Sequence, residues 1–228
     1  MDRAQASRHV DWVFAYGSLI WNPEIDFDRA ELVKVHGFHR AFCIRSIHHR
    51  GTPEHPGVVL GLDRGGSCIG MAFRLRPETR AESIDILYER EMQYAVYVPT
   101  LVGTALADGT RIRALTFVAN RANNAYERLA EEDILQRMRC CAGQRGANVD
   151  YLINTWRSLQ QHGVHDEMLA RLAQNAGPEV RPAPTPIRVA DPGRGAPPVP
   201  ASPPSAARAG TAAVPACARH AASSDSVA

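Results

Sequence analysis

The stretch VFAYGSLIW at residues 13–21 decides how the rest of the chain is interpreted. It begins as an apolar run typical of a buried strand, and a glycine and a hydroxyl follow where that strand should end. A strand that ends at Gly17-Ser18 presents unpaired backbone N–H groups in a tight turn, which can bind a carbonyl or anionic oxygen. Taken alone, the pattern also describes an ordinary first strand followed by a turn.

The composition is that of a globular protein with a substantial core. The chain has 228 residues, 45% of them apolar, and a net charge of +2 from 26 basic and 24 acidic side chains. This balance argues against a nucleic-acid partner. No apolar run approaches the roughly 18 to 20 residues of a membrane span, and the first ten residues lack the apolar stretch of a secretory signal. We therefore expect neither a membrane nor nucleic acid as partner.

The cysteines indicate a reduced, cytoplasmic protein. They are odd in number and contain no CxxC pair, so their spacing favours neither a zinc site nor a secreted disulfide framework. They are Cys43, Cys68, Cys140, Cys141 and Cys217.

The chain divides into three regions by composition. From residue 176 onward it holds 11 of the 16 prolines and no aromatic residue. Such a segment cannot bury enough apolar surface to offset its ordering entropy. We expect an N-terminal arm over residues 1–10, a folded domain over 11–175 and a disordered Pro/Ala-rich tail over 176–228.

Within the folded domain, strands come first and helices last. The patterns predict strands over 12–16, 32–44, 58–62, 68–75, 94–106 and 111–118, and helices after Pro77, over 130–142 and over 149–173. Hairpin turns are predicted at 63–66 and at Asp108-Gly109. This order lacks a regular βαβ alternation, so it predicts a mixed α/β, or α+β, fold rather than a doubly wound sheet.

The helix predicted over residues 78–91 carries an apolar stripe that ends on an acid. The stripe consists of Ala81, Ile84, Leu87 and Tyr88, followed by Glu91. An inward carboxylate can simply pair with a buried arginine or a backbone amide. It can instead be a proton acceptor, because partial removal from water raises the pKa of a carboxyl group toward neutrality.

An ordered set of motifs resembles the γ-glutamylcyclotransferase superfamily, and specifically its ChaC branch. The most specific motif is FAYGSLIW at 14–21, and the match extends over about residues 12–172. The other motifs are HRGTP at 49–53 with Pro56-Gly57, Arg90-Glu91-Met92, Ala142-Gly143 with Gly146-Ala147-Asn148, and Tyr151-Leu152. The resemblance implies a small β-barrel flanked by helices.

The same resemblance implies a reaction on glutathione. The free α-amine of the γ-glutamyl group attacks its own γ-carbonyl, and the products are 5-oxoproline and Cys-Gly. Glu91 corresponds to the catalytic acid and base, and Tyr151 to a tyrosine at the rim of the site. The residues implied to bind the γ-glutamyl moiety are Val13, Phe14, Ala15, Tyr16, Gly17, Ser18 and Leu19. The reaction implies a small-molecule substrate and no cofactor.

Two alternatives remain open at this stage. The chain could act on other γ-glutamyl peptides or γ-glutamylamines, or it could be a non-catalytic binding protein on the same fold. Three histidines close in sequence could be metal ligands: His48, His49 and His55. Adjacent histidines on an extended chain point in opposite directions, however, and no acidic residue is spaced to complete a site. We therefore expect no metal site.

Overall fold

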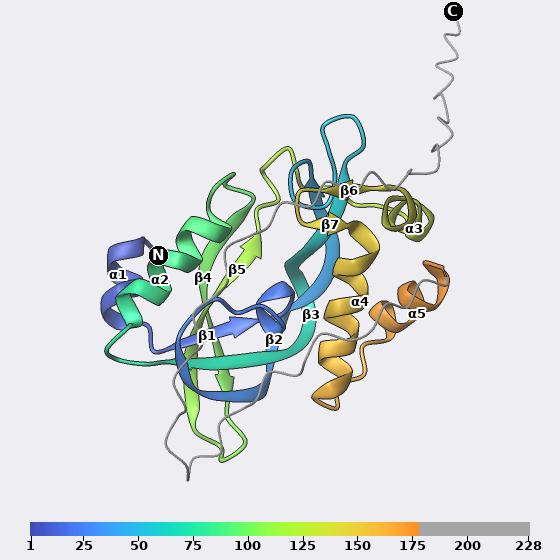
Figure 1. Cartoon of the computed structure of the whole chain (residues 1–228). Coiled ribbons are helices and arrows are strands. Elements are labelled where there is room, and N and C mark those ends of the chain that lie inside the picture. The colour runs from blue at the N-terminus through green and yellow to red at the C-terminus, as the bar shows by residue number, and fades with distance from the viewer. Residues whose placement is uncertain (178–228) are drawn as a thin grey trace, which may run out of the picture. The chain divides into compact units, whose positions relative to one another are not determined.

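A computed structural model describes residues 1–177, which form a curved sheet with helices gathered at its two ends (Figure 1). The predicted tail lies, from residue 178 onward, outside the described residues. The elements are α1 (Arg3–His9), β1 (Trp12–Ala15), the 3-10 turn η1 (Ser18–Ile20), β2 (Phe27–Ser46), β3 (Gly57–Leu75), α2 (Arg80–Glu91), β4 (Tyr97–Ala105), β5 (Arg111–Ala119), α3 (Glu131–Cys140), β6 (Ala142–Gly143), β7 (Gly146–Ala147), α4 (Asn148–Gln161) and α5 (Glu167–Asn175).

The five long strands form one sheet in the order β2-β3-β1-β5-β4. The short strand β1 lies antiparallel to β3 and parallel to β5. The Gly17-Ser18 turn that follows β1 therefore begins at the central strand of the sheet. Within residues 1–177 no ladder joins the edge strands β2 and β4, although the Thr104 hydroxyl donates to the Lys34 carbonyl at 2.8 Å. The α+β class is confirmed, and the sheet curves without closing into the small barrel that the resemblance implies.

The hairpin predicted at residues 63–66 is wrong, because both flanking segments belong to the single strand β3. Both halves pair with β2, with Arg64 opposite Phe38 and Ser67 opposite His36. Gly65 and Gly66 adopt positive φ angles of 101° and 69°, which produce an irregularity rather than a reversal of the chain. The glycine pair therefore bends the strand.

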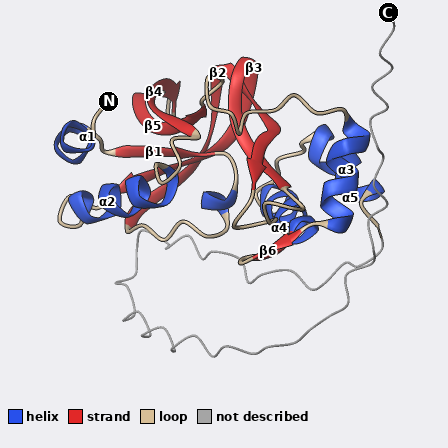
Figure 2. Cartoon of the chain, turned by 90° about the horizontal axis from the view of Figure 1, so that it is seen from above, coloured by secondary structure: helices blue, strands red, loops and turns tan. Residues whose placement is uncertain are grey.

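Helices cover the two ends of the sheet (Figure 2). Residues 1–10, predicted as an arm, include α1, and Arg3 binds Asp85 of α2 at 2.5 Å. Helix α2 buries Ile84 and Leu87 as its apolar stripe predicts, although Ala81 is exposed. The helical segment predicted over 149–173 is two helices, α4 and α5, separated near Gly163, whose φ is 73°. Among the helices of residues 1–177, none combines the length and the apolar character that spanning a bilayer requires.

The loop between β2 and β3 packs backbone against backbone. A Cβ atom at Gly57 would lie closer than 3.0 Å to the Arg50 carbonyl and to the Asn148 side chain. Asn148 is itself fully buried, accepts from the Val58 N–H at 2.7 Å and donates to the Val58 carbonyl at 2.8 Å. The start of α4 and the start of β3 are thus held together with no room for an added methyl group.

We predict that Gly57→Ala destabilises the protein by about 3 kcal/mol, because rigid backbone must move to admit the methyl group. Urea unfolding measures the change in the free energy of unfolding. Gly103→Ala is the matched control: nothing lies within 4 Å of its Cβ position, so we expect no loss of stability. Equal stability of the two variants would contradict this description of the loop.

Candidate active site

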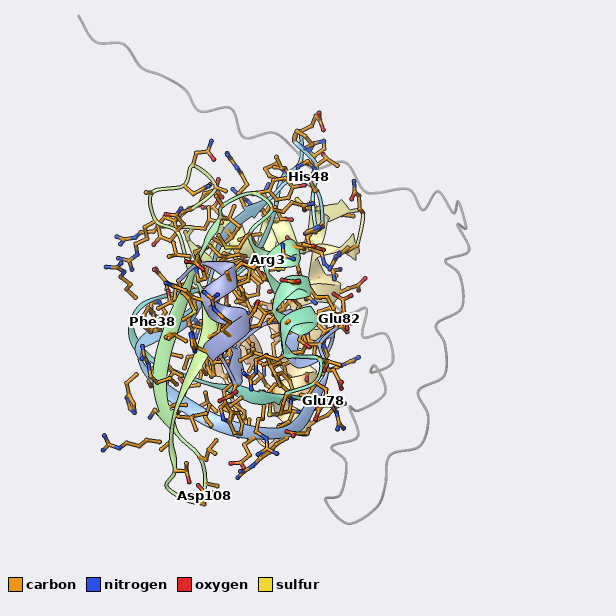
Figure 3. All side chains as sticks on the ribbon, turned by 90° about the vertical axis from the view of Figure 1, so that its left-hand side faces the viewer. Arg3, Phe38, His48, Glu78, Glu82 and Asp108 are labelled. Atoms are coloured by element: carbon orange, nitrogen blue, oxygen red, sulfur yellow. The ribbon has the colours of Figure 1, made fainter. Side chains whose placement is uncertain are left out.

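Two adjoining cavities meet at the end of α2. The larger has a volume of about 590 Å³ and is lined by the β2–β3 loop, the segment after α2, residues 123–125, Arg145 and Tyr151. The smaller has a volume of about 30 Å³ and lies against the end of β1. Ser18, Glu91 and Tyr97 line both cavities, so these three side chains mark the junction. Figure 3 shows His48, which lines the larger cavity, at one end of the molecule, and Asp108 of the β4–β5 turn at the other.

The predicted binding turn divides between the small cavity and the core. Phe14, Tyr16, Gly17, Ser18 and Leu19 line the small cavity, whereas the core residues Val13 and Ala15 line neither. The Tyr16 hydroxyl donates to the Phe117 carbonyl at 2.7 Å, which fixes the ring against β5. A Cβ atom at Gly17 would lie 3.0 Å from the Tyr151 hydroxyl, so the glycine permits close approach of that tyrosine.

Glu91, predicted to point inward, is the last residue of α2 and is largely buried. Only 15% of its side chain is exposed, and Oε1 lies 3.2 Å from Arg90 Nε. Burial raises the pKa of the Glu91 carboxyl above its ordinary value, while the positive charges of Arg90 and Arg145 oppose the rise. The carboxyl therefore combines restricted hydration with cations close enough to keep an ionised form accessible.

Arg90 connects Glu91 to the binding turn. Its Nη2 donates to Ser18 Oγ at 2.9 Å, and its Nη1 donates to Glu24 at 2.8 Å and to the Asn22 carbonyl at 2.8 Å. The arginine stands next to Glu91 in the sequence, yet these partners lie more than sixty residues away. Its guanidinium thus fixes the position of the carboxyl relative to Ser18.

Two tyrosines from distant elements share one backbone anchor beside the junction. The Tyr97 hydroxyl donates to the Leu60 carbonyl at 2.8 Å, and the Tyr151 hydroxyl accepts from the Leu60 N–H at 3.3 Å. Burial raises the pKa of both hydroxyls, so both tyrosines stay neutral at ordinary pH. Tyr151, expected at the rim, is in fact buried, with 7% exposed. Its side chain nevertheless lines the larger cavity.

The larger cavity is strongly basic. Among the described residues that line it, Glu91 is the one acid, while four arginines contribute positive charge. Burial and the neighbouring cations lower the pKa of His49, which keeps its ring neutral. Within residues 1–177 no three His, Cys, Asp or Glu side chains are grouped as metal ligands. The arginines are Arg45, Arg50, Arg90 and Arg145. Such a cavity suits an anionic small molecule.

Comparison with known protein families shows which family has this sequence. Residues 11–177 match the sequence profile of the family described as ChaC-like protein. The chain belongs to the ChaC-like family. The family predicted from the motifs at 14–21, 49–57, 90–92 and 142–152 is thereby confirmed.

Relatives of this ChaC-like chain include proteins named as glutathione-specific gamma-glutamylcyclotransferases. It is 35% identical over 159 residues to the glutathione-specific gamma-glutamylcyclotransferase of Escherichia coli K12, covering 69% of each chain. It is 31% identical over 173 residues to human glutathione-specific gamma-glutamylcyclotransferase 1, covering 73% of this chain and 78% of the human protein.

The fold of this ChaC-like chain is also found among solved structures. The crystal structure of a gamma-glutamyl cyclotransferase specific to glutathione from yeast superposes with a TM-score of 0.67 at 22% identity. The match covers 72% of this chain and 94% of the yeast protein. At this identity, the similarity supports the α+β fold alone.

Several lining residues of the ChaC-like site are absent from the sequence prediction. Tyr97 lies on a strand, and the alternation of apolar and polar residues along a strand predicts which side of the sheet a residue occupies but not which residues it contacts. Arg145 lies in a short turn that carries no recognisable sequence pattern. Arg50 and Arg90 stand inside quoted motifs, so the HRGTP and Arg-Glu signals could have found them. The remaining residues come together only through the tertiary fold.

Proposed function

We propose that this protein is a γ-glutamylcyclotransferase that cleaves glutathione to 5-oxoproline and Cys-Gly. The position of Glu91 carries the proposal: a largely buried carboxyl lies where the two cavities meet, opposite the turn after β1. The names of the relatives from Escherichia coli and human support glutathione as the substrate.

Glu91 acts as base and then as acid. Its carboxylate takes a proton from the α-ammonium of the γ-glutamyl group, which frees the nitrogen lone pair. The nitrogen attacks the γ-carbonyl carbon, and a tetrahedral intermediate forms with its negative charge on oxygen. The C–N bond to cysteine then breaks as Glu91 returns the proton to the departing nitrogen. Glu91 carries a second proton from the ring nitrogen to the released amine, so the ring leaves as a neutral lactam and Cys-Gly as an ammonium. Atoms balance without water, and the proton cycle needs no cofactor.

The turn from Val13 to Leu19 binds the γ-glutamyl group in this proposal. Phe14, Tyr16, Gly17, Ser18 and Leu19 supply the wall of the small cavity, and the core residues Val13 and Ala15 hold β1 in place beneath it. Donors from this turn stabilise the developing oxyanion, each by about 3 kcal/mol. Tyr151, next to Gly17, adds a neutral hydroxyl from α4. Holding amine and carbonyl in one bent conformation accelerates ring closure further.

We place the reaction in the cytoplasm. Two buried cysteines within the described residues, Cys43 and Cys68, are free thiols. A reducing compartment keeps such thiols unpaired, and glutathione is abundant in its reduced form there.

The pH dependence of the reaction follows from the raised pKa of Glu91. Only the ionised carboxylate can accept the ammonium proton, so we expect kcat/KM to fall as the pH decreases through that pKa, with a midpoint above the ordinary value of 4.5. Removing the opposing charge in Arg90→Met should move the midpoint to higher pH. A pH–rate profile of both proteins measures this, and an acidic limb that is identical in the two would contradict the assignment.

A substrate panel tests the proposed function. Purified protein is incubated with glutathione, with γ-Glu-Ala and with a γ-glutamylamine, and 5-oxoproline is measured by mass spectrometry. We expect turnover of glutathione above the other two. Turnover of γ-Glu-Ala alone would assign a different γ-glutamyl substrate, and binding of glutathione without any product would favour a non-catalytic protein.

A further inference from the structure

Arg145 differs from the other arginines of the larger cavity in its contacts. Arg90 is engaged by Ser18 and by the carboxylates of Glu24 and Glu91, and Arg45 contacts the Asn124 carbonyl at 3.3 Å. Arg50 donates to the Ala147 carbonyl at 3.0 Å, and its guanidinium lies 5.6 Å from the centre of the Tyr151 ring. The Arg145 side chain, by contrast, makes no ion pair or hydrogen bond within residues 1–177. It is exposed, yet it lines the cavity.

The backbone that carries Arg145 is fixed to the cavity wall. In the turn between β6 and β7, the Gln144 N–H donates to the His48 carbonyl at 2.8 Å and the Arg145 N–H donates to the His49 carbonyl at 2.9 Å. A Cβ atom at Gly143 would lie closer than 3.0 Å to the same loop, so the two segments pack in direct backbone contact. Figure 1 shows β6 and β7 beside the β2–β3 loop. The side chain therefore starts from a defined position on the cavity wall, although its charged end is free.

Substrate orientation decides which anionic group reaches this arginine. Glu91 and Ser18 line the small cavity as well as the large one, whereas Arg145 lines the large cavity only. A γ-glutamyl group that reacts at Glu91 occupies the junction, so the amine that leaves must extend into the large cavity. In glutathione that amine is Cys-Gly, and its far end is a carboxylate.

We propose that Arg145 is a specificity-determining residue that binds the terminal carboxylate of the leaving amine, which is the glycyl carboxylate of glutathione. This inference rests on the proposed function, and it adds the residue that recognises the glycyl end of the substrate. An arginine fork can donate two parallel hydrogen bonds to a carboxylate. Because the side chain has no protein partner to give up, no existing contact is lost on binding. Substrates with an uncharged leaving amine lack this interaction.

The test compares glutathione with its monoethyl ester, in which the glycyl carboxyl is uncharged. At a pH on the plateau of the rate profile, we expect Arg145→Met to raise the KM for glutathione roughly tenfold, the value of one charge-assisted hydrogen bond, with little change in kcat. The KM for the ester should not change. Arg145→Lys keeps the charge and should recover part of the loss.

Arg113→Met is the matched control, because Arg113 is an exposed arginine of β5 that lines neither cavity. It should leave both KM values unchanged. A KM in Arg145→Met that is unchanged for glutathione, or that rises equally for glutathione and the ester, would overturn the assignment and leave the proposed function standing. Absence of turnover of both compounds by the unsubstituted protein would overturn the proposed function and, with it, this inference.

Discussion

Glu91→Gln lowers kcat for glutathione by roughly a thousandfold, the middle of the range for loss of a general acid–base group, while the protein stays folded. Glutamine has the shape of the glutamate side chain but accepts no proton at neutral pH. Without a base, the substrate amine stays protonated at the junction of the two cavities and cannot attack the γ-carbonyl. Product formation followed by mass spectrometry measures the loss.

Stability separates this catalytic role from a structural one. Burial raises the pKa of Glu91 in the folded protein above its ordinary value of 4.5. The contribution of this carboxyl to stability is therefore fully present at pH values below the ordinary pKa, and it is lost as the pH rises through the folded-state pKa. At neutral pH the ionised carboxylate is therefore less well stabilised in the native state than in the unfolded chain. We expect Glu91→Gln to be at least as stable as the parent there, and urea unfolding at neutral and acidic pH checks this sign.

Glu89→Gln is the control for the loss of an acid on the same helix. Glu89 is exposed and lines neither cavity, so kcat should be unchanged. If Glu91→Gln retained full turnover, or if it unfolded at neutral pH, Glu91 would be a structural partner of Arg90 rather than the base.

Arg40→Met lowers the free energy of unfolding by about 3 to 5 kcal/mol, as expected when one partner of a buried ion pair is removed. Only 4% of the Arg40 side chain is exposed. It forms an ion pair with Asp166, and it donates to the Tyr16 carbonyl at 2.6 Å and to the Ile69 carbonyl at 2.8 Å. Its loss leaves a largely buried carboxylate unpaired and releases the strand end that leads into Gly17. Urea unfolding gives the change.

Asp166→Asn supplies the matching half of a double-mutant cycle. Asp166 caps α5 by accepting from the Leu169 N–H at 3.0 Å, and asparagine can keep that cap. The double variant leaves no unpaired carboxylate, so it should lose less stability than the sum of the two single variants. Strict additivity would show that Arg40 acts through its backbone contacts alone and not through the ion pair.

The fold class and the inward position of Glu91 could be predicted from local sequence. Residues 12–16 are apolar and adjacent, so the strand and its glycine turn follow from a short stretch of chain. Glu91 could be predicted because its helical spacing from Ile84 and Leu87 is a local quantity, and the structure buries all three side chains wholly or largely.

The rest depends on contacts between distant parts of the chain. A Gly-Gly pair at 65–66 reads as a turn locally, but pairing of both flanks with β2 keeps β3 continuous. Arg40 carries no pattern of its own, since its partners Tyr16 and Asp166 lie 24 and 126 residues away. Tyr97 and Arg145 reach the cavity from β4 and the β6–β7 turn, and no spacing in the sequence shows that these elements face Glu91.

Turnover of glutathione in water enriched in oxygen-18, with products identified by mass spectrometry, tests the central claim most directly. Ring closure by the substrate's own amine uses no water. We therefore predict equal amounts of Cys-Gly and of 5-oxoproline that carries no label, with both products formed roughly a thousandfold more slowly by Glu91→Gln. Glutamate with oxygen-18 in its γ-carboxyl would instead show hydrolysis of the γ-glutamyl bond, and it would contradict the account.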